Sequence, residues 1–224
     1  ILLILVPFFL IVNQPDLGTS LLLLANGLTV IVISGISIWF IIVGFIIFIS
    51  LIPVTWNLLH NYQQNRILTF LNPENDPLGS GYHIAQSKIA IGSGGFTGKG
   101  YMQGSQSQLE FIPEIHTDFV FSILSEEFGF LGTLSVVGLI IVITSITYNI
   151  ANKFNRNFFN RVLAYGLISN FFFASMINMS MVIGLLPVVG LPLPLVSYGG
   201  SSMITYFIGF GLILSMERKL KTNY

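Results

Sequence analysis

The sequence predicts an all-α fold, a polytopic bundle of transmembrane helices with one large extracytoplasmic loop. Hydrophobic residues make up 53% of the 224 residues and charged residues only 8%, whereas soluble globular chains carry about 25% charged residues. The apolar residues gather in runs close to the roughly 20 residues that a spanning helix needs. One long segment, 58–118, interrupts these runs and contains all three histidines and most of the acidic residues. A chain with so few charged residues cannot cover a water-facing surface.

The apolar runs predict about six spans. They lie near 1–12, 17–36, 38–56, 119–148, 162–188 and 193–216. The first run has no basic segment before it and no small-residue cleavage site after it, so it is not a signal peptide. We expect it to be a shortened span, and the chain to be the C-terminal part of a longer protein. The polar segment 58–118 is too long for a tight turn and predicts the large loop.

Short loops indicate how the bundle is oriented, because Lys and Arg mark the cytoplasmic side of a membrane protein. The link 149–161 contains Lys153, Arg156 and Arg161, and the tail contains Arg218, Lys219 and Lys221. Both are therefore expected on the cytoplasmic side. The turn at Asp16, the loop 58–118 and the link near Ser197 then share the outer face.

Composition excludes several classes of function. The chain has no cysteine, so disulfides, thiol nucleophiles and cysteine metal sites are impossible. A formal net charge of zero gives no indication of a nucleic-acid partner. His60, His83 and His116 are far apart in the sequence, so we expect no metal site from them.

Asp118 is the first candidate for chemistry, because it lies where the polar loop ends and an apolar run begins. A helix N-cap is the simplest alternative. Asp118, Ser122, Ser125 and Glu126 would however share one face of a helix. Glu126 and Glu127 lie about two turns into an otherwise apolar run, and acids in a span usually face the bundle interior or a wet cavity. An N-cap explains Asp118 but not this acidic face, which favours a functional role.

Asp16 also lies at a boundary, just before the run 17–36. It is either the N-cap of a helix or a carboxylate that contacts a polar headgroup at the membrane surface. The local sequence leaves both alternatives open.

Glycine and proline mark two further segments. The run 91–100 is rich in glycine, but Lys99 is followed by Gly100, so it lacks the spacing of a nucleotide-binding P-loop. A tightly turning loop is favoured, although its backbone N–H groups and Lys99 could contact a diphosphate. Prolines 187, 192 and 194 interrupt the helical pattern. A tight outer turn near Ser197, followed by close helix packing through small residues, explains this second segment.

Together these motifs resemble the SEDS family (shape, elongation, division and sporulation), over essentially the whole chain. The resemblance is carried by QPDLGTS at 14–20, by the polar segment 62–100, by QSQLEFIPEIHTDFVFSILSEEFGFLG at 106–132 and by GLLPVVGLPLPLVSYGGSS at 184–202. The IPEIHTDF and QSQLEF details favour the RodA branch, which acts in elongation, over the FtsW division branch. The family has ten spans, and this chain resembles the last six.

The resemblance implies a peptidoglycan glycosyltransferase in the bacterial cytoplasmic membrane, with its active site on the outer face. It would polymerise lipid II into β-1,4 glycan strands during elongation. The family's essential acid falls on Asp118, the expected general base, and Asp16 would position substrate. The outer link at Ser197 is included among the expected substrate-binding residues.

The resemblance also implies a diphosphate leaving group, which needs positive charge or N–H donors. Lys88 and Lys99 are the candidates in this chain, and a divalent cation such as Mg²⁺ or Mn²⁺ is a further one. Glu126 would tune the pKa of Asp118 through the shared helical face. Expected partners are lipid II, membrane lipid, the elongation machinery and a class B penicillin-binding protein with transpeptidase activity.

Two alternatives come from other classes of protein. A lipid II flippase would also have many spans and interior acids, although transporter sites usually lie near the midplane and Asp118 is expected at the outer boundary. A non-catalytic scaffold for the penicillin-binding protein would leave Asp118 without a chemical role.

Overall fold

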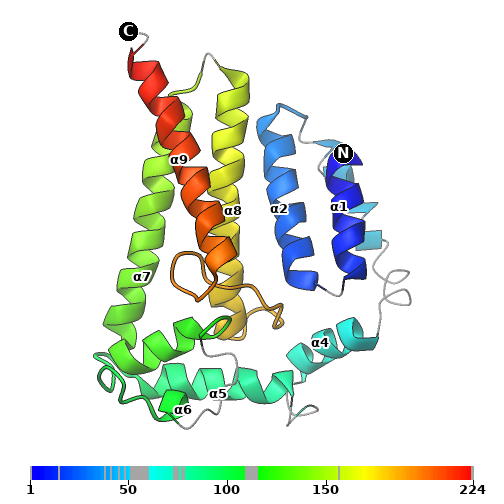
Figure 1. Ribbon diagram of the computed structural model, residues 1–224. Helices are drawn as coiled ribbons and strands as arrows, with labels where there is room; N and C mark the ends of the chain where they lie inside the picture. The colour runs from blue at the N-terminus through cyan, green and yellow to red at the C-terminus, as the bar shows by residue number, and fades with distance from the viewer. Residues whose placement is uncertain are drawn as a thin grey trace.

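The computed structural model is built from α-helices (Figure 1). It describes residues 2–14, 16–37, 39–40, 42–44, 46–47, 49–50, 61–72, 76, 79–108, 116–155 and 157–222. The helices are α1 (Leu2–Asn13), α2 (Leu17–Ile33), α4 (Asn61–Leu71), α5 (Ser80–Ser93), α6 (Ser105–Gln108), α7 (Val120–Asn152), α8 (Phe158–Val182) and α9 (Gly200–Thr222). These described residues contain no strand, and the predicted all-α class is confirmed.

The helices α1, α2, α7, α8 and α9 fall on five of the predicted apolar runs. The sixth, 38–56, is helical at its described positions between 39 and 50, and 51–56 lie outside the described residues. Among the described helices, α7 and α8 are long and apolar enough to cross a membrane, and α1 and α2 are shorter apolar helices. The number of spans therefore stays a prediction.

The apolar helices pack around α8. Figure 1 shows α7, α8 and α9 running alongside one another, with α2 beside α8 and α1 outside α2. Large side chains of α8 such as Phe171 and Met181 are fully or almost fully buried. The outward side of α7 in contrast exposes large apolar residues, among them Leu134, Leu139 and Ile146. A contiguous exposed apolar surface of this kind is typical of a membrane-facing helix.

Three of the described helices lie inside the segment that the sequence predicted as a loop, 58–118. Figure 1 shows α4 and α5 lying across the end of the bundle where α7 begins. Within α5, the Ser87 hydroxyl donates a 2.7 Å hydrogen bond to the Val182 carbonyl. The described part of this segment is thus largely helical and covers the end of the bundle.

A kink at Gly129 divides α7. This residue has φ 64° and ψ −160°, outside the helical region, and a side chain here would place its Cβ 2.3 Å from the Gly98 nitrogen. The freed backbone groups bind the glycine-rich loop, since the Phe130 and Leu131 N–H groups donate to the carbonyls of Gly95 and Phe96 at 2.9 and 3.2 Å. Gly129 is required both by its φ and by the close approach of this loop.

The non-helical segment 183–199 differs from the predicted spans. The helix α8 ends at Val182 and α9 begins at Gly200, whereas the sequence predicted spans to 188 and from 193. The proline nitrogens in this segment have no N–H to continue a helix. Gly184 and Gly190 adopt φ +77° and +72°, which turn the chain back over the end of α8.

Replacing Gly129 by alanine should destabilise the fold, whereas Gly138→Ala in the same helix should not. The first change forces a positive φ on an L-residue, at a cost of about 1–3 kcal/mol, and pushes against the loop backbone. Gly138 is helical and a Cβ there meets nothing within 4 Å. Thermal unfolding of the full-length protein in detergent should show a midpoint several degrees lower for Gly129→Ala alone. Equal midpoints would show that the kink is not needed.

Candidate active site at the end of the bundle

Asp118 lies in a short non-helical stretch at the start of α7. The N-cap position falls on Phe119, one residue later, and its side chain makes no capping bond. The predicted helical face therefore applies to Ser122, Ser125 and Glu126, which are buried, while Asp118 precedes the helix. The Asp118 carboxylate lies beside Gly190, because a Cβ built on Gly190 would be 3.4 Å from its Oδ2 atom.

The side chain of Asn178 binds the backbone of this stretch. It belongs to α8 and is completely buried. Its Nδ2 group donates to the Asp118 carbonyl at 2.8 Å and to the Leu191 carbonyl at 2.6 Å. One amide thus joins the stretch that carries the carboxylate to the segment 183–199.

Ser197 makes the second connection between the same two segments. Its Oγ accepts a hydrogen bond from the Leu193 N–H at 2.8 Å and donates to the Thr117 carbonyl at 2.5 Å. The Tyr198 N–H donates to the His116 carbonyl at 2.9 Å. The Ser197 hydroxyl is thus occupied by the backbone, and its predicted contact with substrate stays a prediction.

Asp16 lies at the start of α2, a helix that also contacts the segment 183–199. It is the N-cap of this helix, with Oδ1 accepting from the Thr19 N–H at 3.0 Å and Oδ2 from the Thr19 hydroxyl at 2.6 Å. The capping alternative is therefore confirmed, and a headgroup contact stays a prediction. Two residues further on, a Cβ at Gly18 would lie 2.5 Å from the Val189 carbonyl oxygen. Glycine here allows α2 to touch the segment that also borders Asp118.

Glu126 and Lys99 form an ion pair at 2.7 Å, and the carboxylate has no exposed surface. Its oxygens also accept hydrogen bonds from the Ser105 hydroxyl at 3.1 Å and from the Gln106 N–H at 3.2 Å. The Lys99 and Gly100 N–H groups donate to the carbonyls of Glu126 and its neighbour at 3.0 Å. Glu126 therefore fastens the glycine-rich loop to α7. The sequence predicted an influence of Glu126 on Asp118 and did not predict this contact with the loop.

Lys88 is an exposed residue of α5. A Cβ on Gly184 would lie 2.2 Å from its Cε atom and 2.6 Å from its Nζ atom, so its side chain runs along the C-terminal end of α8. A cation is favourable at this end because the last carbonyls of a helix carry partial negative charge. The Lys88 cation is thus explained by its place at the end of α8, and its contact with a diphosphate stays a prediction.

Comparison with known proteins identifies the family. The family described as cell cycle protein, which includes FtsW, RodA and SpoVE, matches residues 1–222. This chain belongs to that family. The predicted resemblance is thereby confirmed.

Within the FtsW/RodA/SpoVE family the chain is similar to named enzymes. Peptidoglycan glycosyltransferase MrdB of Escherichia coli (strain K12) is 49% identical over 222 residues, 99% of this chain and 60% of MrdB. Peptidoglycan glycosyltransferase RodA of Treponema pallidum (strain Nichols) is 45% identical over 161 residues, 72% of this chain and 37% of that protein. The chain thus spans less than two thirds of the length of each of these relatives.

A solved structure of the family shares the fold. It concerns the structural coordination of polymerization and crosslinking by a peptidoglycan synthase complex, and it matches with a TM-score of 0.81 at 32% identity. The match covers 97% of this chain and 60% of the other. The arrangement of helices in this chain is therefore similar to that of the matching part of this structure.

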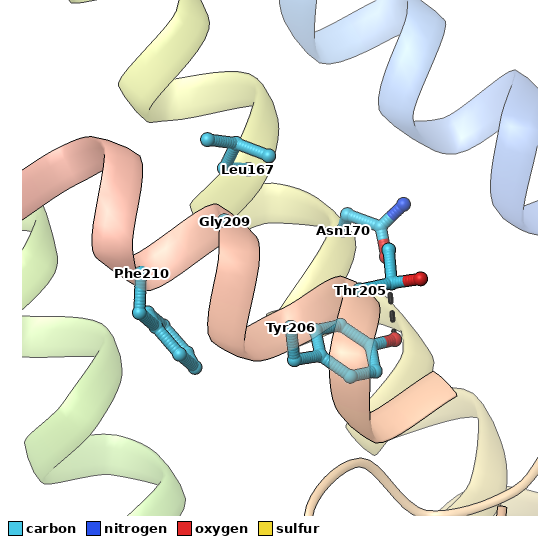
Figure 2. A pocket seen from close by; sticks show the side chains of 6 residues that line it. All are labelled: Leu167, Asn170, Thr205, Tyr206, Gly209 and Phe210. Carbon is cyan, nitrogen blue, oxygen red and sulfur yellow. Dashed lines mark hydrogen bonds between the residues drawn. The ribbon is translucent and has the colours of Figure 1, made fainter. Parts of the chain in front are cut away.

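A hollow between α8 and α9 lies apart from the residues that the sequence singled out in this family member. Figure 2 shows its lining, which comprises Leu167, Asn170, Thr205, Tyr206, Gly209 and Phe210. The Tyr206 hydroxyl donates to the Asn170 Oδ1 atom at 3.3 Å. A polar pair between apolar helices is a common form of helix–helix contact, which explains the pair without a ligand.

Sequence reasoning missed Asn178, Gly18 and Gly190 as parts of this family member's site. An amide inside the apolar run 162–188 was the available signal for Asn178, because polar groups in such runs are costly and usually have buried partners. The two glycines gave no such signal. Their importance comes from contacts with residues far away in the sequence.

Lys99→Ala should loosen the glycine-rich loop more than Glu126→Gln. The first change leaves a carboxylate with no exposed surface without its cation, whereas Lys99 is 30% exposed and can turn to water. We expect a loss of about 1–3 kcal/mol, because Ser105 and Gln106 still donate to the carboxylate. Hydrogen exchange of the amides in 94–106 should become roughly tenfold faster or more.

Lys153→Ala is the matched control for that experiment. Lys153 pairs with Glu217 at 2.7 Å, but its own side chain is 54% exposed, and exposed pairs contribute little. Exchange in 94–106 should stay as in the wild type. The same protection of this loop in all three variants would contradict the fastening role of Glu126.

Proposed function

We propose that this chain is part of a peptidoglycan glycosyltransferase that polymerises lipid II during cell elongation. The observation that carries the proposal is the position of Asp118 at the end of the bundle. The side chains of Asn178 in α8 and Ser197 in the segment 183–199 donate hydrogen bonds to backbone carbonyls of the stretch that carries its carboxylate. The names of the relatives MrdB and RodA support the same activity.

Asp118 acts as the general base in this proposal. Its carboxylate takes the proton from the 4-hydroxyl of the acceptor GlcNAc while that oxygen attacks C1 of the donor MurNAc. The bond from C1 to the diphosphate oxygen breaks, and undecaprenyl diphosphate leaves with both electrons of that bond. An α-linked donor becomes a β-1,4 linkage by one inversion, so no protein nucleophile is needed. A positioned base typically contributes about 10² to 10⁴-fold to such a rate.

The departing diphosphate needs compensation for its negative charge. Lys88 is the better candidate in this chain, because Lys99 already neutralises the buried Glu126. No group of three His, Asp or Glu side chains suited to a metal ion occurs within the described residues. A divalent cation stays a prediction, and no step of the proposal is assigned to one.

The proposed setting is the bacterial inner membrane, with several spans and Asp118 on the outer side. The C-terminal end of α7 lies at the opposite end of the bundle from its start (Figure 1), and Lys153 is the C-cap residue there, which supports a cytoplasmic location for that end. A class B penicillin-binding protein is the proposed partner, supported by the matching synthase complex in which polymerization and crosslinking are coordinated. The exposed apolar helices would let polyprenyl tails arrive through the bilayer.

Asp118→Asn tests the activity and the base together. Purified lipid II is given to the full-length protein with its penicillin-binding partner, whose transpeptidase is inactivated, and the glycan strands are measured. We expect strands from the wild type and a loss of about 10²-fold or more from Asp118→Asn, because the amide cannot accept the proton. Glu217→Gln, the same change at the other end of the bundle, should leave strand synthesis unchanged.

Other results would support the alternatives. Normal polymerisation by a folded Asp118→Asn variant would mean that another group is the base. Transfer of lipid II across vesicles by a wild type that makes no strands would support a flippase. Neither activity, with normal growth of cells that carry only Asp118→Asn, would support a scaffold.

A further inference from the structure

Asn178 is a completely buried amide that contacts the stretch carrying the Asp118 carboxylate. Its helix, α8, is apolar around it, and the side chain has no exposed surface. Its Nδ2 group donates two hydrogen bonds to backbone carbonyls of other segments, those of Asp118 and Leu191. Its contacts thus join non-helical chain from two places, 60 and 13 residues away in the sequence.

The two carbonyls belong to the two segments that meet at the Asp118 carboxylate. One belongs to Asp118 itself, so Asn178 fixes the residue that carries the carboxylate. The other belongs to Leu191, directly after Gly190, the residue that lies against the Asp118 Oδ2 atom. The Asn178 amide therefore binds both the residue that carries the proposed base and the backbone segment that lies beside its carboxylate.

The amide is not explained as packing alone. Its Oδ1 atom is buried without a hydrogen-bond partner among the described residues, and such a group destabilises a fold. An apolar side chain of similar size would fill the same space without that cost. The gain that offsets it is the pair of bonds to the two carbonyls, whose geometry only a two-donor group can provide.

We propose that Asn178 is a positioning residue for glycosyl transfer, which fixes the position of the Asp118 carboxylate beside Gly190. This rests on the proposed function. Because a base must lie within hydrogen-bond reach of the proton that it removes, a shift of about 1 Å can lower the rate by about 10²-fold. The substrate itself would touch Asp118 and not Asn178.

The test compares kcat and KM for lipid II in the full-length protein with its partner. Asn178→Leu fills the space and removes both donors, so kcat should fall about 10- to 100-fold while KM stays within about twofold, since substrate contacts are retained. Asn178→Gln keeps the two donors on a longer side chain and should recover part of kcat. Ser175→Ala is the matched control, because Ser175 is equally buried in α8 but bonds only to Phe171 of its own helix.

An unchanged kcat in Asn178→Leu would overturn the proposal, and so would a loss that lies entirely in KM. Should the leucine variant not fold, Asn178→Ala decides, because it also removes both donors: a lower kcat at constant KM supports the proposal, and wild-type kcat overturns it. Hydrogen exchange of the amides in 116–121 gives a measure that needs no activity. It should be faster in the Asn178 variants and unchanged in Ser175→Ala. An inactive wild type would reject the proposed function, whereas wild-type exchange in the variants would reject the role of Asn178 by itself.

Discussion

The contact between the stretch 116–119 and the segment 183–199 is the constraint on which this end of the molecule depends. Neither part is helical, so their backbone groups must find partners outside regular structure. The Asn178 amide and the Ser197 hydroxyl provide these partners from inside the bundle and from the turn itself. The helix α2 touches the same segment through Gly18. This one contact therefore fixes the start of α2, the start of α7 and the end of α8 relative to one another.

The fold was predictable to the extent that it depends on local composition. Apolar runs located α1, α2, α7, α8 and α9, because lipid-facing helices need continuous apolar sequence. Two features escaped. The helix α5 has the glycine and serine content of a loop, and its stability comes from packing against α7 and α8. The ends of α8 and α9 were misplaced because Leu and Val continue through 183–199, although that segment turns back over the helix end.

The candidate site was predictable in its acids and not in their supports. Asp118 and Asp16 stand at boundaries between polar and apolar sequence, where a carboxylate is conspicuous. Which side chain approaches each of them depends on contacts over long sequence separations, as for Asn178 and Leu191. Glu126 illustrates the limit: the helical period placed it correctly on the buried face with Ser122 and Ser125, but its partner Lys99 comes from the loop and could not be inferred from that period.

The kink at Gly129 has a consequence for where the acids of α7 lie relative to a bilayer. A straight helix of 33 residues would be about 50 Å long, much more than a hydrocarbon layer of about 30 Å. Figure 1 shows the first turns of α7 running at an angle to the rest, and the remaining residues, 130–152, measure about 35 Å. The hydrophobic thickness is thus matched by the part after the kink. In a bilayer whose hydrocarbon layer is spanned by residues 130–152, Glu126 and Glu127 would lie outside that layer, where neither bears the roughly 2.5–3.5 kcal/mol that an acid costs at the bilayer centre.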